Sequence, residues 1–176
     1  MFNIKSEDVN KLPLPRRKLL DRLIPLLGTI DTGKLNQELS KIEIKNEELG
    51  NNFHDWALNI NIVTKEEQSP IIEINALKWG CFLKIDNHTL YLNEGAPEED
   101  LFDEKRIKEI SHLLNKLLEG FTIARYLDKK GRLRKRVFYY GVDEPKRENK
   151  IETVIPTFKS LFLITHTITK KRYIFK

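Results

Sequence analysis

Residues 120–140 read GFTIARYLDKKGRLRKRVFYY and contain the clearest secondary-structure pattern of the chain. Apolar and polar residues alternate on both sides of Asp128-Lys129-Lys130-Gly131, a sequence typical of a type I turn followed by a glycine in the left-handed conformation. The stretch therefore predicts two antiparallel strands joined by a three-residue loop. It makes antiparallel sheet one component of the fold.

A three-residue loop also sets the register of this hairpin. It places Asp128 opposite Arg132, Tyr126 opposite Arg134, Ala124 opposite Arg136, and Thr122 opposite Phe138. One face then carries the three arginines with Tyr126, and the other carries an apolar set that would join the core: Phe121, Ile123, Leu127, Leu133, Val137 and Tyr139. Arg125 and Lys135 would oppose each other on the apolar face, so either they reach its rim or the register is displaced by one residue.

A strong amphipathic helix is predicted just before the hairpin, over about 98–119. Acidic residues crowd its N-terminal end, where the helix dipole favours them, and Gly120 provides its C-terminal stop. Its apolar residues recur at helical spacing and form one broad stripe: Ile107, Ile110, Leu113, Leu114, Leu117 and Leu118.

The N-terminal part predicts further helical segments. Pro13 and Pro15 indicate that residues 1–14 form a flexible or extended arm. A helix can begin at Pro15 and end or kink near Ile24, before Pro25; a second short helix is expected over about 32–42. On the first helix the leucine stripe is Leu19, Leu20, Leu23 and Leu27, with Arg16, Arg17, Lys18 and Asp21 mostly away from it.

Between these helical regions the apolar period changes to two, which predicts a meander of strands. Residues 56–62 and 72–85 alternate, with a change of parity near Ala76 that suggests a bulge or bend. This places Trp79 and Cys81 on the apolar side, and residues 89–93 should pair back. After the hairpin, 141–150 reads as loop, and 153–158, 160–167 and 171–175 as strands. The sequence predicts one α+β domain over residues 1–176: an antiparallel meander with the long helix packed on it.

Composition narrows the class of protein. Of the 176 residues 40% are hydrophobic and 32% charged, which is typical of a folded globular chain. No apolar run approaches the roughly 20 residues needed to cross a bilayer, so no membrane contact is expected. A single cysteine cannot form an internal disulfide, and the N-terminal residues lack the order of a secretory signal. We expect a cytoplasmic protein.

Charge is distributed unevenly along the chain. Residues 121–176 contain 15 Lys and Arg against 5 Asp and Glu, whereas the other residues contain 16 against 21. This asymmetry suggests either a polyanionic partner for the basic part or a basic face covered by the chain's own acidic segment, 94–104. A solvated arginine face that protects the sheet from pairing with other chains is the third interpretation.

The leading functional hypothesis is a non-enzymatic binding protein that contacts a polyanion, most simply RNA or DNA backbone. Alternate residues on a strand are about 6.6 Å apart, comparable with phosphate spacing, and arginine can grip phosphate with two parallel hydrogen bonds. Lys129, Lys130, Arg132, Arg134 and Arg136 would contact phosphates. Tyr126, Phe138 and Tyr140 could stack on bases.

Two alternatives belong to other classes. The protein could be an interaction module, such as an inhibitor, an immunity-like factor or an assembly subunit. It would dock through the hairpin or through an acidic surface made of Glu98, Glu99, Asp100 and Asp103. It could also be an enzyme whose site is assembled from residues distant in sequence.

No motif identifies a reaction, a cofactor or a metal. Residues 28–34, GTIDTGK, match most of a phosphate-binding loop, but Leu35 stands where a hydroxyl must ligate magnesium and Asp31 would repel phosphate. The histidines lack metal-ligand spacing: His54, His88, His112 and His166. Cys81 lies on an apolar strand face and is expected to be buried and unreactive.

Overall fold

The computed structural model describes residues 2, 4, 6–48, 54–66, 70–86, 88–141, 150–154 and 167–176. It divides the chain into two compact units, Met1–Asn115 (unit 1) and Lys116–Lys176 (unit 2), which are described separately. The α+β class predicted from the sequence is confirmed, since both sheets are antiparallel and helices accompany them. The prediction of a single domain stays a prediction.

Unit 1 contains a five-stranded sheet whose order β1-β2-β3-β4-β5 follows the chain. Its strands are β1 Lys41–Glu48, β2 His54–Ile62, β3 Ile72–Leu77, β4 Gly80–Ile85 and β5 His88–Glu94. Its helices are α1 Ser6–Val9, α2 Leu14–Leu27, α3 Glu98–Leu101 and α4 Glu104–Glu119. The last turn of α4 belongs to unit 2. The predicted meander is therefore present, with β1 as an additional strand, and residues 32–40 contain no helix where a short one was predicted over about 32–42. Ile42 and Ile44 alternate with polar residues in β1, which is a strand period.

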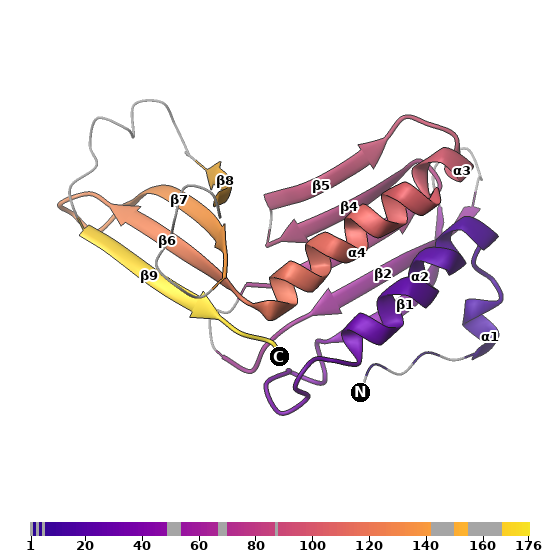
Figure 1. Ribbon diagram of the computed structural model, residues 1–176, viewed down its shortest axis with the longest axis horizontal. Coiled ribbons are helices and arrows are strands. Elements are labelled where there is room, and N and C mark those ends of the chain that lie inside the picture. The colour runs from indigo at the N-terminus through magenta and orange to yellow at the C-terminus, as the bar shows by residue number, and fades with distance from the viewer. Residues whose placement is uncertain are drawn as a thin grey trace. The chain divides into compact units, whose positions relative to one another are not determined.

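Helices α2 and α4 lie side by side across one face of this sheet (Figure 1). The inward residues of the central strands are fully buried beneath them: Leu58, Ile60, Ile62, Ile72, Ile74, Ala76, Cys81, Leu83 and Ile85. Asn93 and Tyr91 of β5 also belong to the helix side, because they donate hydrogen bonds to Leu101 O (3.0 Å) and to Glu109 Oε2 (3.5 Å). No helix among the described residues is long and apolar enough to span a bilayer.

Four local predictions in unit 1 need correction. Helix α2 continues past Pro25 to Leu27, and Arg16 lies on its buried side because it precedes Leu19 and Leu20 by one helical turn. Residues 72–85 form two strands joined by a tight turn at Lys78 and Trp79, and this turn causes the parity change that suggested a bulge. Trp79 is consequently 46% exposed and lies outside the core.

The predicted long helix is present, but it is divided. α3 ends before Phe102, and Asp103 then caps α4 by accepting a hydrogen bond from the Arg106 N–H at 2.7 Å. The apolar stripe of α4 is buried as expected at Ile107, Ile110, Leu114, Leu117 and Leu118. In the predicted arm, Ser6–Val9 form one helical turn and Leu12 is buried.

Unit 2 contains a four-stranded antiparallel sheet of order β8-β7-β6-β9. Its strands are β6 Phe121–Leu127, β7 Leu133–Tyr140, β8 Lys150–Val154 and β9 Thr167–Tyr173. The central β6–β7 hairpin is the one predicted from residues 120–140. Strand 153–158 overlaps β8 and strand 171–175 overlaps β9, whereas residues 155–166, with most of the strand predicted at 160–167 and His166, lie outside the described residues.

Candidate polyanion interface

The β6–β7 turn forms as the sequence predicts. Gly131 has φ of 73°, its N–H donates to Asp128 O at 2.9 Å, and the Asp128 N–H donates to Arg132 O at 2.9 Å. Asp128 and Arg132 are thus opposite each other. Leu127 then pairs with Leu133, as the loop length requires.

Beyond Leu133 the predicted register is wrong by one residue. A bulge between Tyr126 and Leu127 displaces the pairing, so that Tyr126 pairs with Lys135, Arg125 with Arg136, Ala124 with Val137, Ile123 with Phe138 and Thr122 with Tyr139. An extra residue in β7 has this effect, because two residues of the bulged strand then oppose one on its partner. The displacement removes the predicted opposition of Arg125 and Lys135.

Asp128 explains the positions of two of the three hairpin arginines. Its Oδ2 accepts from Arg132 Nε (3.0 Å), Arg134 Nε (3.0 Å) and Arg134 Nη2 (2.6 Å), and its Oδ1 accepts from the backbone N–H groups of Lys130 and Arg132. The Arg132 N–H is the main cause that lowers the pKa of Asp128, with Arg134 and Lys130 adding to it against a smaller opposing effect of burial. Arg132 and Arg134 are therefore already paired with a carboxylate inside the hairpin.

Among the described residues, Arg125 and Arg136 have no such carboxylate. They are direct cross-strand neighbours, and the Nε atom of each is buried and has no hydrogen-bond partner. Their strand face is shared by Ile123 and Phe138, which are at most 2% exposed, so the two guanidinium groups border an apolar surface. This arrangement places two positive charges together with unsatisfied donors.

Other cations lie on the same sheet, but of the β9 cations Lys170, Lys171 and Arg172 only Lys171 shares the face of the pair, because side chains alternate along a strand. β9 pairs with β6 so that Lys171 is opposite Ile123, and its neighbours Lys170 and Arg172 are opposite Ala124 and Thr122. Lys129 and Lys130 are exposed at the hairpin tip. The cations of β9 were not among the predicted site residues, because no short-range pattern pairs residues 167–173 with β6.

The three aromatic candidates differ in their accessibility. Phe138 is fully buried, so the prediction that its ring stacks on a base is corrected. Lys135 Nζ lies 5.1 Å from the centroid of the Tyr126 ring, and Lys116 Nζ lies 5.3 Å from that of Tyr140. Tyr126 and Tyr140 thus each already have a lysine over the ring.

The alternative acidic surface is partly used by unit 1 itself. Glu98 Oε1 accepts from Arg16 Nε at 2.8 Å, and Arg16, which is fully buried, also forms two parallel hydrogen bonds with Asp55, at 2.6 and 2.7 Å. Burial raises the pKa of Asp55, but hydrogen bonding and the charge of Arg16 outweigh that effect and lower it overall. Asp103 is the cap of α4. Two of the four acidic candidates therefore have structural roles.

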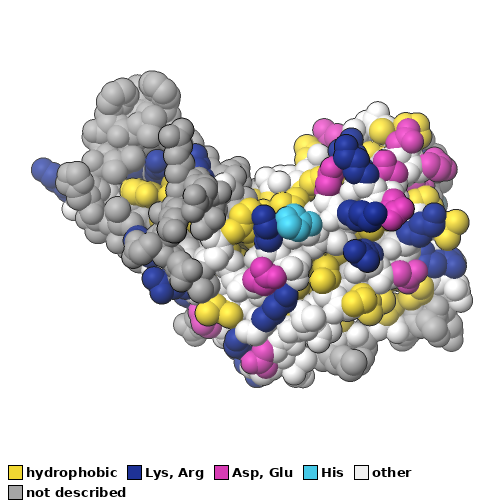
Figure 2. Space-filling view, viewed as in Figure 1, with side chains coloured by type: hydrophobic (Ala, Val, Ile, Leu, Met, Phe, Trp, Pro, Cys, Tyr) yellow, Lys and Arg dark blue, Asp and Glu magenta, His cyan; other side chains and the backbone are white. Residues whose placement is uncertain are grey.

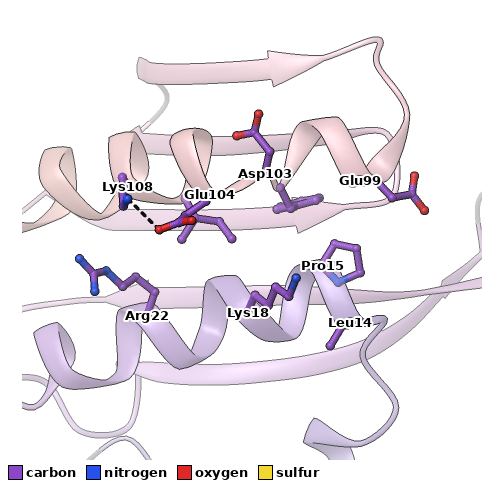
Figure 3. Close-up of a pocket in the computed structure, with 10 residues that line it drawn as sticks. Leu14, Pro15, Lys18, Arg22, Glu99, Asp103, Glu104 and Lys108 are labelled. Atoms are coloured by element: carbon purple, nitrogen blue, oxygen red, sulfur yellow. Dashed lines mark ion pairs between the residues drawn. The ribbon is translucent and has the colours of Figure 1, made fainter.

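Acidic and basic side chains share the groove beside these candidates. A groove of about 480 Å³ between α2 and the start of α4 is lined by Glu99, Asp103 and Glu104 but also by Lys18, Arg22 and Lys108. Figure 3 shows these side chains interleaved, with Glu104 paired to Lys108 at 2.7 Å, and Figure 2 shows both signs mixed over the helices of unit 1. This surface lacks the single sign of charge that would attract a basic partner.

Cys81 is buried as expected, and the structure shows what Asp31 contacts in the 28–34 segment. Cys81 is fully buried, and burial raises the pKa of its thiol to about 12, which disfavours the reactive thiolate. Asp31 Oδ1 accepts a hydrogen bond from the Gly33 N–H at 2.9 Å, so the carboxylate occupies a donor that a phosphate would need.

Comparison of the whole chain with known protein families, with curated proteins and with solved structures finds no match.

Proposed function

We propose that the protein binds a polyanion, most simply the phosphate backbone of RNA or DNA, through the β6–β7–β9 sheet of unit 2. The observation that carries this proposal is the Arg125–Arg136 pair. Like charges directly opposite each other on a sheet are destabilising, and a buried N–H donor without an acceptor costs about 1–3 kcal/mol. An anion between the two guanidinium groups would relieve both costs.

Phosphate suits this position better than a single side-chain carboxylate. Its oxygens can accept paired hydrogen bonds from two arginines at once, and arginine presents its donors in a planar fork that matches them. The cations at Lys129, Lys130 and Lys171 would extend the contact along a polymer. The proposal assigns no catalytic role to any residue and requires no cofactor. It is compatible with the cytoplasmic location expected from the sequence.

Titration of a labelled single-stranded oligonucleotide and of a duplex at several salt concentrations tests this proposal. We expect binding that weakens linearly in log affinity against log salt, as release of counterions from phosphates requires. R125Q/R136Q should abolish most of the affinity and lower the salt slope by about 2. K129Q/K130Q, which removes the same charge from the exposed tip, should have a smaller effect.

Two results would contradict the proposal. One is an unmodified protein that ignores both nucleic acids at low salt. The other is an equal loss of affinity in R125Q/R136Q and K129Q/K130Q, which would mean that net charge alone, and not the Arg125–Arg136 pair, determines binding.

A further inference from the structure

The arginines of the β6–β7 hairpin are not arranged as a row of equivalent charges along one strand. Arg132 and Arg134, two of the three arginines predicted to follow successive phosphates, donate hydrogen bonds to Asp128 at 2.6–3.0 Å. That carboxylate already offsets part of their charge. Within the described part of unit 2, the buried guanidinium donors without an acceptor therefore lie at one point, the Arg125–Arg136 pair.

The pair offers these donors in a restricted place. Both side chains are partly exposed, but their Nε atoms are buried and have no hydrogen-bond partner. Ile123 and Phe138, the next residues on the same face of β6 and β7, are at most 2% exposed, so apolar side chains close one side of the pair. An acceptor for both Nε atoms must therefore enter between the two guanidinium groups. This requirement favours a small anion with oxygens on several sides.

A phosphate at the end of a strand meets this requirement better than a phosphate within it. A phosphomonoester carries a charge of about −1.5 to −2 at pH 7, has three free oxygens and is attached to the strand on one side only. A phosphodiester carries one charge and two free oxygens, and a sugar flanks it on each side. Two arginines present two positive charges and paired donors, so the monoester matches them in charge and in number of acceptors.

We infer that the Arg125–Arg136 pair binds the terminal phosphate of a nucleic-acid strand, so that the protein recognises phosphorylated strand ends. The inference rests on the proposed function and narrows it from phosphates in general to a phosphomonoester. The exposed Lys129 and Lys130 at the hairpin tip contact the diesters of the same strand and supply weaker, salt-dependent affinity. Every contact lies within unit 2.

Strands of one sequence that differ only at their ends test the inference. Fluorescence anisotropy of the full chain is measured with a short single strand labelled on an internal base, in three forms: hydroxyl groups at both ends, a 5′-phosphate or a 3′-phosphate. We expect at least one phosphorylated form to bind about tenfold or more tightly than the hydroxyl form, since charge-assisted hydrogen bonds are added. A preference for one end identifies which terminus is bound.

A longer strand controls for charge. A hydroxyl-ended strand extended by about two nucleotides gains as much charge as a terminal phosphate adds, but in diester form. It should bind only slightly more tightly than the original strand. This comparison and the previous one use the unmodified protein, so they do not depend on how any variant folds.

Variants then locate the contact. R125Q/R136Q should bind the phosphorylated and hydroxyl forms equally, whereas K129Q/K130Q, which removes the same charge from the tip, should weaken both forms and keep the preference. R125K/R136K keeps both charges but loses the planar fork, so most of the preference should disappear. Thermal unfolding followed by circular dichroism checks that each variant is folded.

The outcomes separate the inference from the proposed function. If no strand binds at low salt, both are wrong. If the hydroxyl and phosphorylated forms bind equally, or the extended strand gains as much as the phosphorylated ones, the inference alone is wrong and binding to the strand backbone remains. A preference that persists in folded R125Q/R136Q would place the terminal phosphate elsewhere and would also overturn the inference.

Discussion

In unit 1 one buried arginine faces two carboxylates, whereas in unit 2 two partly buried arginines face each other with no carboxylate of the described residues between them. The Arg16 guanidinium donates hydrogen bonds to the carboxylates of Asp55 and Glu98 and to the carbonyl of Trp56. Arg125 and Arg136 leave their Nε atoms without an acceptor. Removing a charge from water is expensive unless partners replace the water. Arg16 is therefore expected to stabilise unit 1, whereas under the proposed function a bound polyanion supplies the acceptors that Arg125 and Arg136 lack.

The largest expected effect comes from breaking the compensated cluster. R16M should destabilise unit 1 by about 3–5 kcal/mol, because Asp55 and Glu98 are left buried without their cation. Urea unfolding followed by tryptophan fluorescence measures this, since both tryptophans belong to unit 1. R22M, on the exposed side of the same helix, is the control and should cost little. Similar losses in the two variants would show that the cluster is not special.

A smaller loss is expected at one carboxylate of the cluster. E98Q keeps the shape of the side chain and one acceptor but removes the charge opposite Arg16 Nε, so it should cost about 1–3 kcal/mol. E99Q changes the exposed neighbour and should lie within about 0.5 kcal/mol of the unmodified protein. If both variants are neutral, the Arg16–Glu98 contact contributes nothing and the acidic surface regains Glu98 as a docking residue.

Asp128 is the one carboxylate of the described part of the hairpin, and its protonation should be visible. Its pKa is lowered, so it stabilises the hairpin fully above the ordinary aspartate pKa of about 3.9 and loses that effect as pH falls toward the lowered value. NMR of the Arg132 and Lys130 amides should show a titration midpoint below about 3.9.

D128N tests the role of the Asp128 carboxylate by removing its charge at every pH. It should destabilise the hairpin at neutral pH, and the difference from the unmodified protein should shrink at acid pH. By releasing Arg132 and Arg134 from their internal carboxylate, it should also strengthen polyanion binding at neutral pH. A midpoint at or above the ordinary value would contradict the pairing of Asp128 with these arginines.

The smallest effect on stability, and one of opposite sign, is expected at the uncompensated pair. R125L or R136L should leave unit 2 unchanged or more stable by up to about 1 kcal/mol, because each removes one of two opposed like charges. Thermal unfolding followed by circular dichroism, together with the oligonucleotide titration, checks this. A clear loss of stability, as in R16M, would show that the pair is compensated within the protein.

The sequence was informative where structure depends on neighbours in the chain. The Asp128–Gly131 turn, the α4 stripe and strand β2 follow from local patterns, and all three are present. The sequence did not locate the bulge in β7. The predicted opposition of Arg125 and Lys135 left a one-residue displacement of the register as one of two alternatives, but nothing in the sequence decided between them, so the Arg125–Arg136 pair was not identified.

Long-range partners account for the other failures. Arg16 has the helical spacing of a buried residue, but its charge favoured exposure as long as no partner was known. Its partners Asp55 and Glu98 are 39 and 82 positions away in the sequence, so no local pattern could identify them. Trp79 was assigned to the core because it shares the parity of Cys81 and Leu83, and a two-residue turn breaks that relation. The alternation of KIEIKNEE in β1 was visible, but its first two residues were assigned to the end of the helix predicted over 32–42 and the rest to no element.

The strand orders of the two sheets imply different routes of formation. In unit 1 each strand pairs with the next one along the chain, so the sheet can grow by successive hairpins while the polypeptide is being synthesised. In unit 2 the β6–β7 hairpin forms locally, but β9 reaches β6 only after all the intervening residues have emerged, with Leu127 pairing to Thr167. Until then one edge of β6, next to the arginine pair, has its backbone groups exposed. In the nascent chain that edge is open to wrong pairing.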